Sequence, residues 1–169
     1  MPVTQPADHR REPGDAVREH LVRVLEWEDA HVAFATAVAN IPGPSRGARP
    51  QGFEHSPWQL LEHIRIAQED ILDFCVNDRY THDRTWPDDY WPTLPAPPDE
   101  AAWVASVAAC TRSRGGLQDI ARDVPDLTAP VPTGGPAQTY LRALLLAADH
   151  VAYHVGQLVA VRRALGVWP

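Results

Sequence analysis

The sequence predicts an all-α protein, a four-helix bundle whose helices run up, down, down and up. Four segments of roughly twenty or more residues carry apolar side chains three or four positions apart, the spacing of an amphipathic helix. The chain shows no alternation of apolar and polar residues that would indicate a strand. A long crossover between the second and third helices permits these two helices to run parallel.

Length and composition indicate one domain. The chain has 169 residues, enough for a substantial core, and we expect residues 15–169 to form it behind a flexible lead-in over residues 1–14. The net charge of −7 argues against nucleic-acid binding, which depends on clustered basic residues. The lead-in lacks the apolar core of a signal peptide, and no uninterrupted run of about 18 apolar residues could span a membrane. We therefore expect a cytoplasmic protein without a membrane partner.

The first helix is expected from about Asp15 to Asn40. Its apolar stripe comprises Val17, Leu21, Val24, Leu25, Val32, Ala35 and Val38. A Pro-Gly-Pro sequence at residues 42–44 ends it, and residues 45–52 have the composition of a loop. His31 lies close to the stripe, where it either lines a pocket or is an ordinary residue at the edge of the core.

The second helix has a clear start signal. Ser56 is a favourable N-cap, Pro57 suits the first helical position, and Gln59 completes a capping box. The apolar stripe that follows includes a histidine: Leu60, Leu61, His63, Ile64, Ala67, Ile71 and Phe74. Asp70 falls on the same face, two turns beyond that histidine. We expect His55 and His82, which flank the helix, to be solvated.

The crossover, residues 77–98, is dense in proline, aspartate and aromatic residues. Such a long connection inside a compact domain is usually functional, and its aromatic residues indicate that it packs on the bundle. Its stretch from Trp86 to Trp91 could cover the bundle, line a pocket or meet a partner subunit. The third helix is expected to begin at Asp99, with acidic residues in its first turn. The fourth is expected from about Ala137 or Gln138 to Leu165, with Gly166 as its stop.

His150 and His154 are four residues apart in the fourth helix and therefore share one face. Buried imidazoles need partners for their nitrogens, and a metal ion is the simplest common partner; the alternative is two packed or surface histidines. With His63, three imidazoles would converge inside the bundle, where metal sites are commonly built. Three protein ligands and an open position are typical of a catalytic zinc site, although spacing does not distinguish zinc from nickel, iron, cobalt or manganese.

Ligating imidazoles need hydrogen-bond partners that fix their tautomers. The candidates by position are Asp70, Asp149, Gln157, Glu28 and His31. Asp149 could equally be a solvated or Arg-paired carboxylate, and Gln157 could simply pack through its aliphatic part. We regard Gln157, Asp70 and His31 as the candidates for orienting or substrate-facing roles in catalysis. The two cysteines, Cys75 and Cys110, have apolar neighbours and are expected to be small core residues.

Two segments resemble the DinB/YfiT-like superfamily. Residues 55–64, HSPWQLLEHI, look like its second-helix motif, and residues 149–158, DHVAYHVGQL, look like its fourth-helix motif. The similarity also extends to residues 86–92 and 162–168. The resemblance implies an up-down-down-up bundle, frequent dimers, and one divalent metal held at positions that here are His63, His150 and His154. Characterised relatives include transferases and isomerases that use bacillithiol, mycothiol or glutathione.

The leading hypothesis is a metal-dependent enzyme that acts on a small molecule. The metal would activate a low-molecular-weight thiol or a water for attack on an electrophile, as an S-transferase or a hydrolase. The alternative is a non-catalytic, stress-related binding or scaffold protein whose metal site is structural or vestigial. These hypotheses differ in whether the metal has an open position facing a solvent-connected pocket.

Overall fold

The computed structural model describes residues 13–26 and 30–169, and within these ranges it is helical without a strand. The long helices are α1 (Pro13–Val24), α4 (Pro57–Val76), α5 (Glu100–Asp123) and α6 (Tyr140–Ala164). Short helices are α2 (Phe34–Val38), α3 (Gly43–Arg46) and the 3-10 helix η1 (Asp88–Tyr90). The prediction of an all-α fold is confirmed for this part of the chain.

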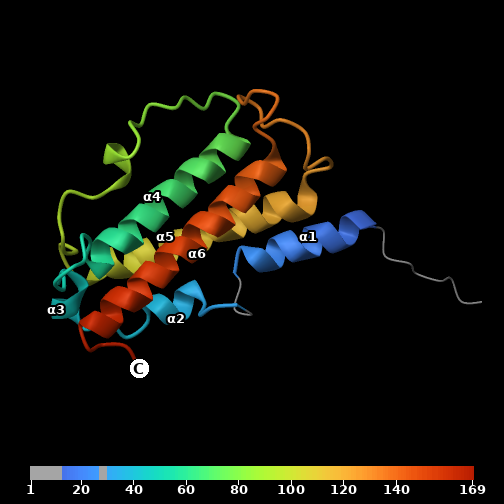
Figure 1. Ribbon diagram of the computed structural model, residues 1–169. Helices are drawn as coiled ribbons and strands as arrows, with labels where there is room; N and C mark the ends of the chain where they lie inside the picture. Colours follow the sequence, from blue (N-terminus) through green and yellow to red (C-terminus); the bar gives the residue numbers. More distant parts are fainter. Residues whose placement is uncertain (1–12, 27–29) are drawn as a thin grey trace, which may run out of the picture.

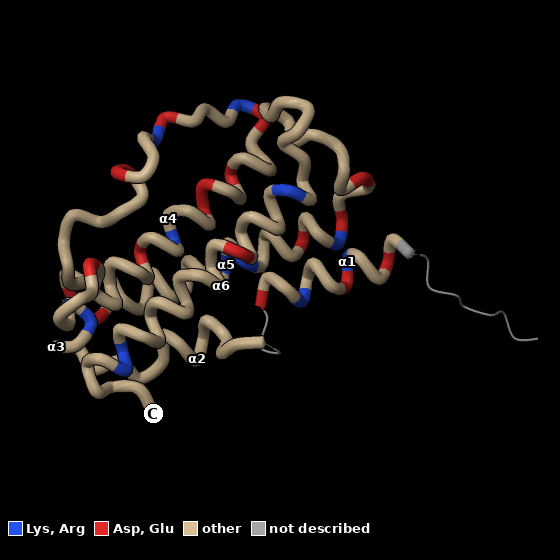
Figure 2. The backbone as a smooth tube through the Cα atoms, in the orientation of Figure 1, with Lys and Arg blue, Asp and Glu red and all other residues tan. Residues whose placement is uncertain are grey.

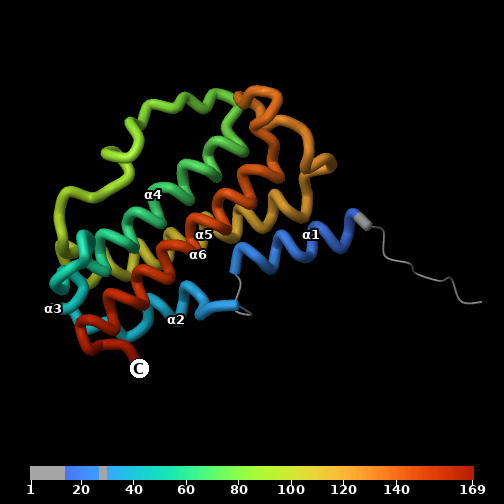
Figure 3. Tube along the Cα trace, in the orientation of Figure 1, coloured from blue at the N-terminus to red at the C-terminus, as the bar shows by residue number. Residues whose placement is uncertain are grey.

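Helix α4 packs against both α5 and α6. Helix α1 packs mainly on α5 and also touches α6. Figures 1 and 3 show α4 and α5 running in the same direction, with α6 running back between the same two ends of the molecule. The segment between α4 and α5 passes along the outside of α4 and carries η1. This long return is what allows two consecutive helices to be parallel.

Two groups of buried residues form the core. One group lies where α2 and the C-terminal half of α6 meet the first turns of α4 and α5: Phe34, Ala37, Val38, Ile41, Trp58, Leu60, Leu61, Ile64, Trp103, Cys110, Val155, Leu158 and Val161. The other joins α1 to the opposite halves of these helices: Leu21, Leu25, Cys75, Leu117, Ile120, Ala121, Leu127, Val131, Ala143, Leu144, Ala147 and Ala148. Both cysteines are buried and free, as expected.

The prediction of one continuous first helix is wrong. Helix α1 ends at Val24, a turn follows, and the chain becomes helical again at Phe34 as α2. The two halves of the expected stripe enter different core groups, since Leu25 belongs to the α1 group and Val38 to the α2 group. The two halves also cover different neighbours, because α1 packs mainly on α5 whereas α2 packs on α6. Val17, expected in the stripe, is 50% exposed.

Some expectations for this region fall outside the described residues. These are Glu28 and most of the lead-in, residues 1–12. The rest of the lead-in, residues 13 and 14, already belongs to α1. The predicted loop at residues 45–52 begins with part of α3, whose first turn contains Pro44 because a fixed φ suits that position.

Hydrogen bonds at the helix ends match the sequence signals closely. The Ser56 hydroxyl accepts from the Gln59 amide at 3.2 Å, and the Gln59 side chain accepts from the Ser56 amide at 3.1 Å, which is the predicted capping box. Asp99 caps α5 by accepting from the Ala102 amide at 2.7 Å. Helix α6 starts at Tyr140, two or three residues later than expected, and Gly166 ends it with a φ of +69°.

Charged residues occur on the described helices except α2, and Figure 2 shows no long basic stretch in the described part. One helix, α6, is long and apolar enough to cross a membrane by length and composition alone, with a mean hydropathy of 1.3. The core helix of a water-soluble protein passes the same test, and α6 supplies buried residues to both core groups.

The capping box yields a first prediction. Replacement of Ser56 by Ala removes the cap of α4 and also the bond that the hydroxyl donates to the Pro95 carbonyl. We expect the free energy of unfolding to fall by about 1–2 kcal/mol, measured by urea unfolding. Thr111→Ala is the control, because Thr111 is exposed within α5 and should cost nothing comparable. Equal stability of the two variants would contradict the capping role.

Candidate metal centre

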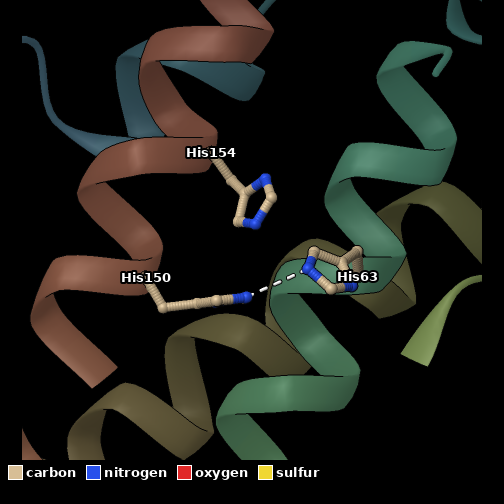
Figure 4. Close-up of side chains that lie close together, drawn as sticks. All are labelled: His63, His150 and His154. Atoms are coloured by element: carbon tan, nitrogen blue, oxygen red, sulfur yellow. Dashed lines mark hydrogen bonds between the residues drawn. The ribbon is translucent and has the colours of Figure 1, made fainter. Parts of the chain in front are cut away.

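Helices α4 and α6 bring the three predicted histidines together. His63 lies on α4, and His150 and His154 lie one turn apart on the facing side of α6, with their rings turned toward one another (Figure 4). One nitrogen from each ring lies within 4.8 Å of the other two. His63 and His154 are 2% and 6% exposed, and His150 is partly buried. The cluster is therefore an interior feature of the helix pair.

The tautomer of His63 is fixed by the crossover. Its Nδ1 lies 2.9 Å from the backbone carbonyl of Tyr90, which can only accept, so Nδ1 carries the proton. Its Nε2 consequently offers a lone pair to the cluster, and lies 3.0 Å from Nε2 of His150. Two nitrogens bound tetrahedrally to zinc at about 2.0–2.1 Å lie about 3.3 Å apart. The pair thus has nearly the spacing that a shared ion requires.

His154 is oriented within α6 itself. Its Nδ1 lies 2.7 Å from the side-chain oxygen of Gln157, whose amide nitrogen donates to the Tyr153 hydroxyl at 3.2 Å. This pair of bonds orients the Gln157 amide, so the imidazole donates through Nδ1 and keeps Nε2 free for the cluster. The structure therefore places Gln157 beside a predicted ligand, as a hydrogen-bond partner.

Burial keeps the cluster neutral. Loss of solvation lowers the pKa of His150 to about 3 and that of His154 to about 4, with the neighbouring imidazoles adding to the effect. It lowers the pKa of His63 as well, against the hydrogen bond to Tyr90, which favours the proton. At neutral pH the three rings are uncharged, each with one nitrogen free of a proton, which is the form that binds a metal ion.

A stack of three rings covers one side of the cluster. Trp91 lies flat on His63, with ring centroids 3.8 Å apart, and His55 lies on the other face of Trp91 at 3.7 Å. The expectation that His55 is solvated is wrong, because this stacking leaves it only partly exposed. His82 is exposed as expected and is hydrogen-bonded to the Tyr80 hydroxyl at 3.1 Å.

The other candidate residues lie at different distances from the cluster. Asp70 accepts hydrogen bonds from the hydroxyls of Tyr90 at 2.6 Å and Tyr80 at 3.1 Å, and so reaches His63 through Tyr90. His31 is exposed, bonds the adjacent Val32 carbonyl and borders a separate small pocket beside α6. Asp149 is exposed. The structure thus does not bring His31 or Asp149 into the histidine cluster.

Two cavities meet the cluster at different histidines. The His150 cavity, of about 490 Å³, is lined by Ala67, Asp70, Ile71, Phe74, Tyr80, His82, Trp86, Tyr90, Thr133, Gln138, Leu146 and His150. The His154 cavity, of about 480 Å³, is lined by Gly52, Phe53, Glu54, His55, Leu60, Trp91, Tyr153, His154, Gln157, Ala160 and Val161. Each has the volume of a small-molecule site. The crossover thus both covers the bundle and lines cavities.

Comparison with protein families decides the assignment of the chain. A family model described as the DinB superfamily matches residues 26–158, which include the three histidines and the whole crossover. The chain belongs to the DinB superfamily. Searches of curated proteins and of solved structures gave no match.

Sequence reasoning missed several residues of this DinB superfamily site. Tyr90 supplies the carbonyl for His63, Trp91 stacks on that ring, and Tyr153 orients Gln157. The one available signal for the first two was the aromatic density of the crossover. For Tyr153 the spacing carried a signal, because it lies four residues before Gln157 and hence on the same face of α6.

The lowered imidazole pKa values predict that the metal-free DinB protein loses stability in mild acid. His150 has a pKa of about 3 when folded against 6.5 as its ordinary value, so between these values the unfolded chain binds more protons. The free energy of unfolding is therefore highest above pH 6.5 and falls as the pH drops toward the pKa of about 3 that His150 has in the folded protein. We expect a loss of about 1–2 kcal/mol from His150 between about pH 7 and pH 5. Urea unfolding with a chelator present measures it, and a drop of the same size in His150→Gln would contradict the assignment.

The cluster geometry also predicts which substitutions remove metal. We expect untagged wild-type protein to bind about one divalent ion per chain and His154→Ala to lose it, because two imidazoles hold an ion far less tightly than three. Metal analysis after dialysis measures the content. His31→Ala is the matched control and should retain the ion, since His31 lies outside the cluster. Tight retention by His154→Ala would overturn the ligand assignment.

Proposed function

We propose that this chain is a metal-dependent enzyme in which α1, α4, α5 and α6 form an up-down-down-up bundle around one divalent ion. His63, His150 and His154 would hold the ion, with zinc or nickel expected ahead of iron, cobalt or manganese. The observation that carries the proposal is the convergence of three neutral imidazoles from two helices beside small-molecule-sized cavities. Membership of the DinB superfamily supports it.

The donor set fits a catalytic ion better than a structural one. Among the described residues the cluster supplies three nitrogen ligands and no fourth protein ligand, whereas structural zinc sites are usually closed by four. All three ligands are neutral, so the full double charge of the ion is retained. A divalent ion bound there supplies Lewis acidity that lowers the pKa of a coordinated thiol or water.

The surrounding residues are suited to hold a small electrophile. The His150 cavity has apolar walls from Ile71, Phe74 and Leu146, and polar groups from Asp70 and Tyr90. Apolar walls with a few polar groups are typical of sites that bind and orient small molecules. Trp91, stacked on His63, excludes water from one face of that ligand.

The proposal extends to the setting in which the enzyme works. We propose a cytoplasmic homodimer that uses a low-molecular-weight thiol and acts on a small molecule, without a nucleic-acid or membrane partner. The net charge of −7 supports the absence of a nucleic-acid partner, because phosphate backbones are bound by excess positive charge. The buried residues that α6 supplies to both core groups support its assignment as a core helix.

A paired assay tests this function. The metal-loaded protein is given an aryl halide with glutathione, mycothiol or bacillithiol, and separately an activated ester without thiol. We expect thioether formation that a chelator abolishes, that added metal restores, and that His154→Ala lacks. Ester hydrolysis without thiol dependence would instead favour the hydrolase alternative. A fully metal-loaded protein inactive in both assays, and across a wider panel of electrophiles, would favour the scaffold alternative.

A further inference from the structure

We propose that Asp70 and Tyr90 are positioning residues for the metal ligand His63. The inference rests on the proposed metal site and concerns how the chain prepares one ligand for it. Asp70 holds the side chain of Tyr90, and the backbone of Tyr90 holds the imidazole of His63. A carboxylate two helical turns from the ligand thus acts on it through a residue of the crossover.

Tyr90 bridges two points on the same face of α4. Its hydroxyl donates to Asp70 at 2.6 Å, and its carbonyl accepts from Nδ1 of His63 at 2.9 Å. His63 and Asp70 are seven residues apart, so they lie about two turns apart along that face. Because both contacts come from one buried residue, fixing the phenol also restricts where the carbonyl can lie.

The phenol contact is a strong anchor. Its acceptor is a carboxylate, and hydrogen bonds to charged groups contribute more to stability than bonds between neutral groups. The Asp70 side chain is 17% exposed, which limits competition from water for the same oxygen.

The residue after Tyr90 gives the anchor a second effect on His63. Trp91 stacks on the imidazole with parallel ring planes, so the same short segment sets both the tautomer and the tilt of the ring. The turn that precedes Tyr90 has hydrogen bonds of its own. In one of them the Thr85 amide donates to the Asp89 carboxylate at 2.7 Å. Loss of the phenol anchor should therefore loosen the contacts to His63 while the turn itself remains formed.

Tyr80 provides a matched control within the same network. Its hydroxyl donates to the other oxygen of Asp70 at 3.1 Å, and it also contacts Phe74 and His82. Tyr80 and Tyr90 thus share one carboxylate, but the bond from His63 ends on Tyr90. Removal of either hydroxyl takes one hydrogen-bond donor from Asp70. If Tyr90 positions His63, the removal at Tyr90 should weaken metal binding and the removal at Tyr80 should not.

The experiment compares Tyr90→Phe with Tyr80→Phe, using Co²⁺ as the probe ion. We expect Tyr90→Phe to weaken Co²⁺ affinity about tenfold and Tyr80→Phe to change it less than about twofold. Direct partners of metal-bound histidines are typically worth 10–100-fold, and the lower end applies because the Tyr90 carbonyl itself remains. The visible absorption of bound Co²⁺, which reports ligand geometry, should change in Tyr90→Phe and match wild type in Tyr80→Phe. A general loss of packing would not separate the two variants in this way.

Asp70→Asn completes the design. If Asp70 acts through Tyr90, combining Asp70→Asn with Tyr90→Phe should weaken affinity no more than the stronger single change does. Should Tyr90→Phe fail to fold, as judged by circular dichroism, Asp70→Asn against Tyr80→Phe makes the same comparison. Wild-type affinity and spectrum in both Tyr90→Phe and Asp70→Asn would overturn the positioning role alone. A wild-type protein that binds no Co²⁺ or Zn²⁺ would overturn the metal site and, with it, the inference.

Discussion

The interior of this protein is built around the need to satisfy three imidazoles that converge between α4 and α6. A buried imidazole is stable only when its nitrogens have partners. The chain provides Nδ1 partners for His63 and His154, the Tyr90 carbonyl and the Gln157 amide, and directs one nitrogen of each ring into a common space.

This constraint explains why the crossover is long and aromatic. The crossover places the backbone carbonyl of Tyr90 beside Nδ1 of His63, although the two residues are 27 positions apart in the sequence. Tyr90 and Trp91 then take the place of water on that side of α4, while other crossover residues line the His150 cavity. A short α4–α5 connection could neither reverse the chain for a parallel neighbour nor deliver this carbonyl.

Features set by neighbouring residues were predictable from the sequence, and features set by distant contacts were not. The α4 capping box, the Gly166 stop and the shared face of His150 and His154 follow from spacings of a few residues. The break after Val24 could not be predicted this way, because helical periodicity continues across it while α1 packs mainly on α5 and α2 packs on α6. The stacking of His55 on Trp91 has the same origin, since these residues meet only in the fold.

The position of Asp70 shows how spacing on a helix can indicate a residue near a site without indicating how it reaches that site. Its spacing from His63 indicates a shared helix face, from which a direct bond to an imidazole is a natural expectation. Two turns of helix are about 11 Å, too far for a carboxylate to reach the ring directly. Tyr90 spans that gap with a phenol at one end and a backbone carbonyl at the other. The connection between Asp70 and His63 thus runs through a crossover residue, which the sequence pattern of the helix alone does not contain.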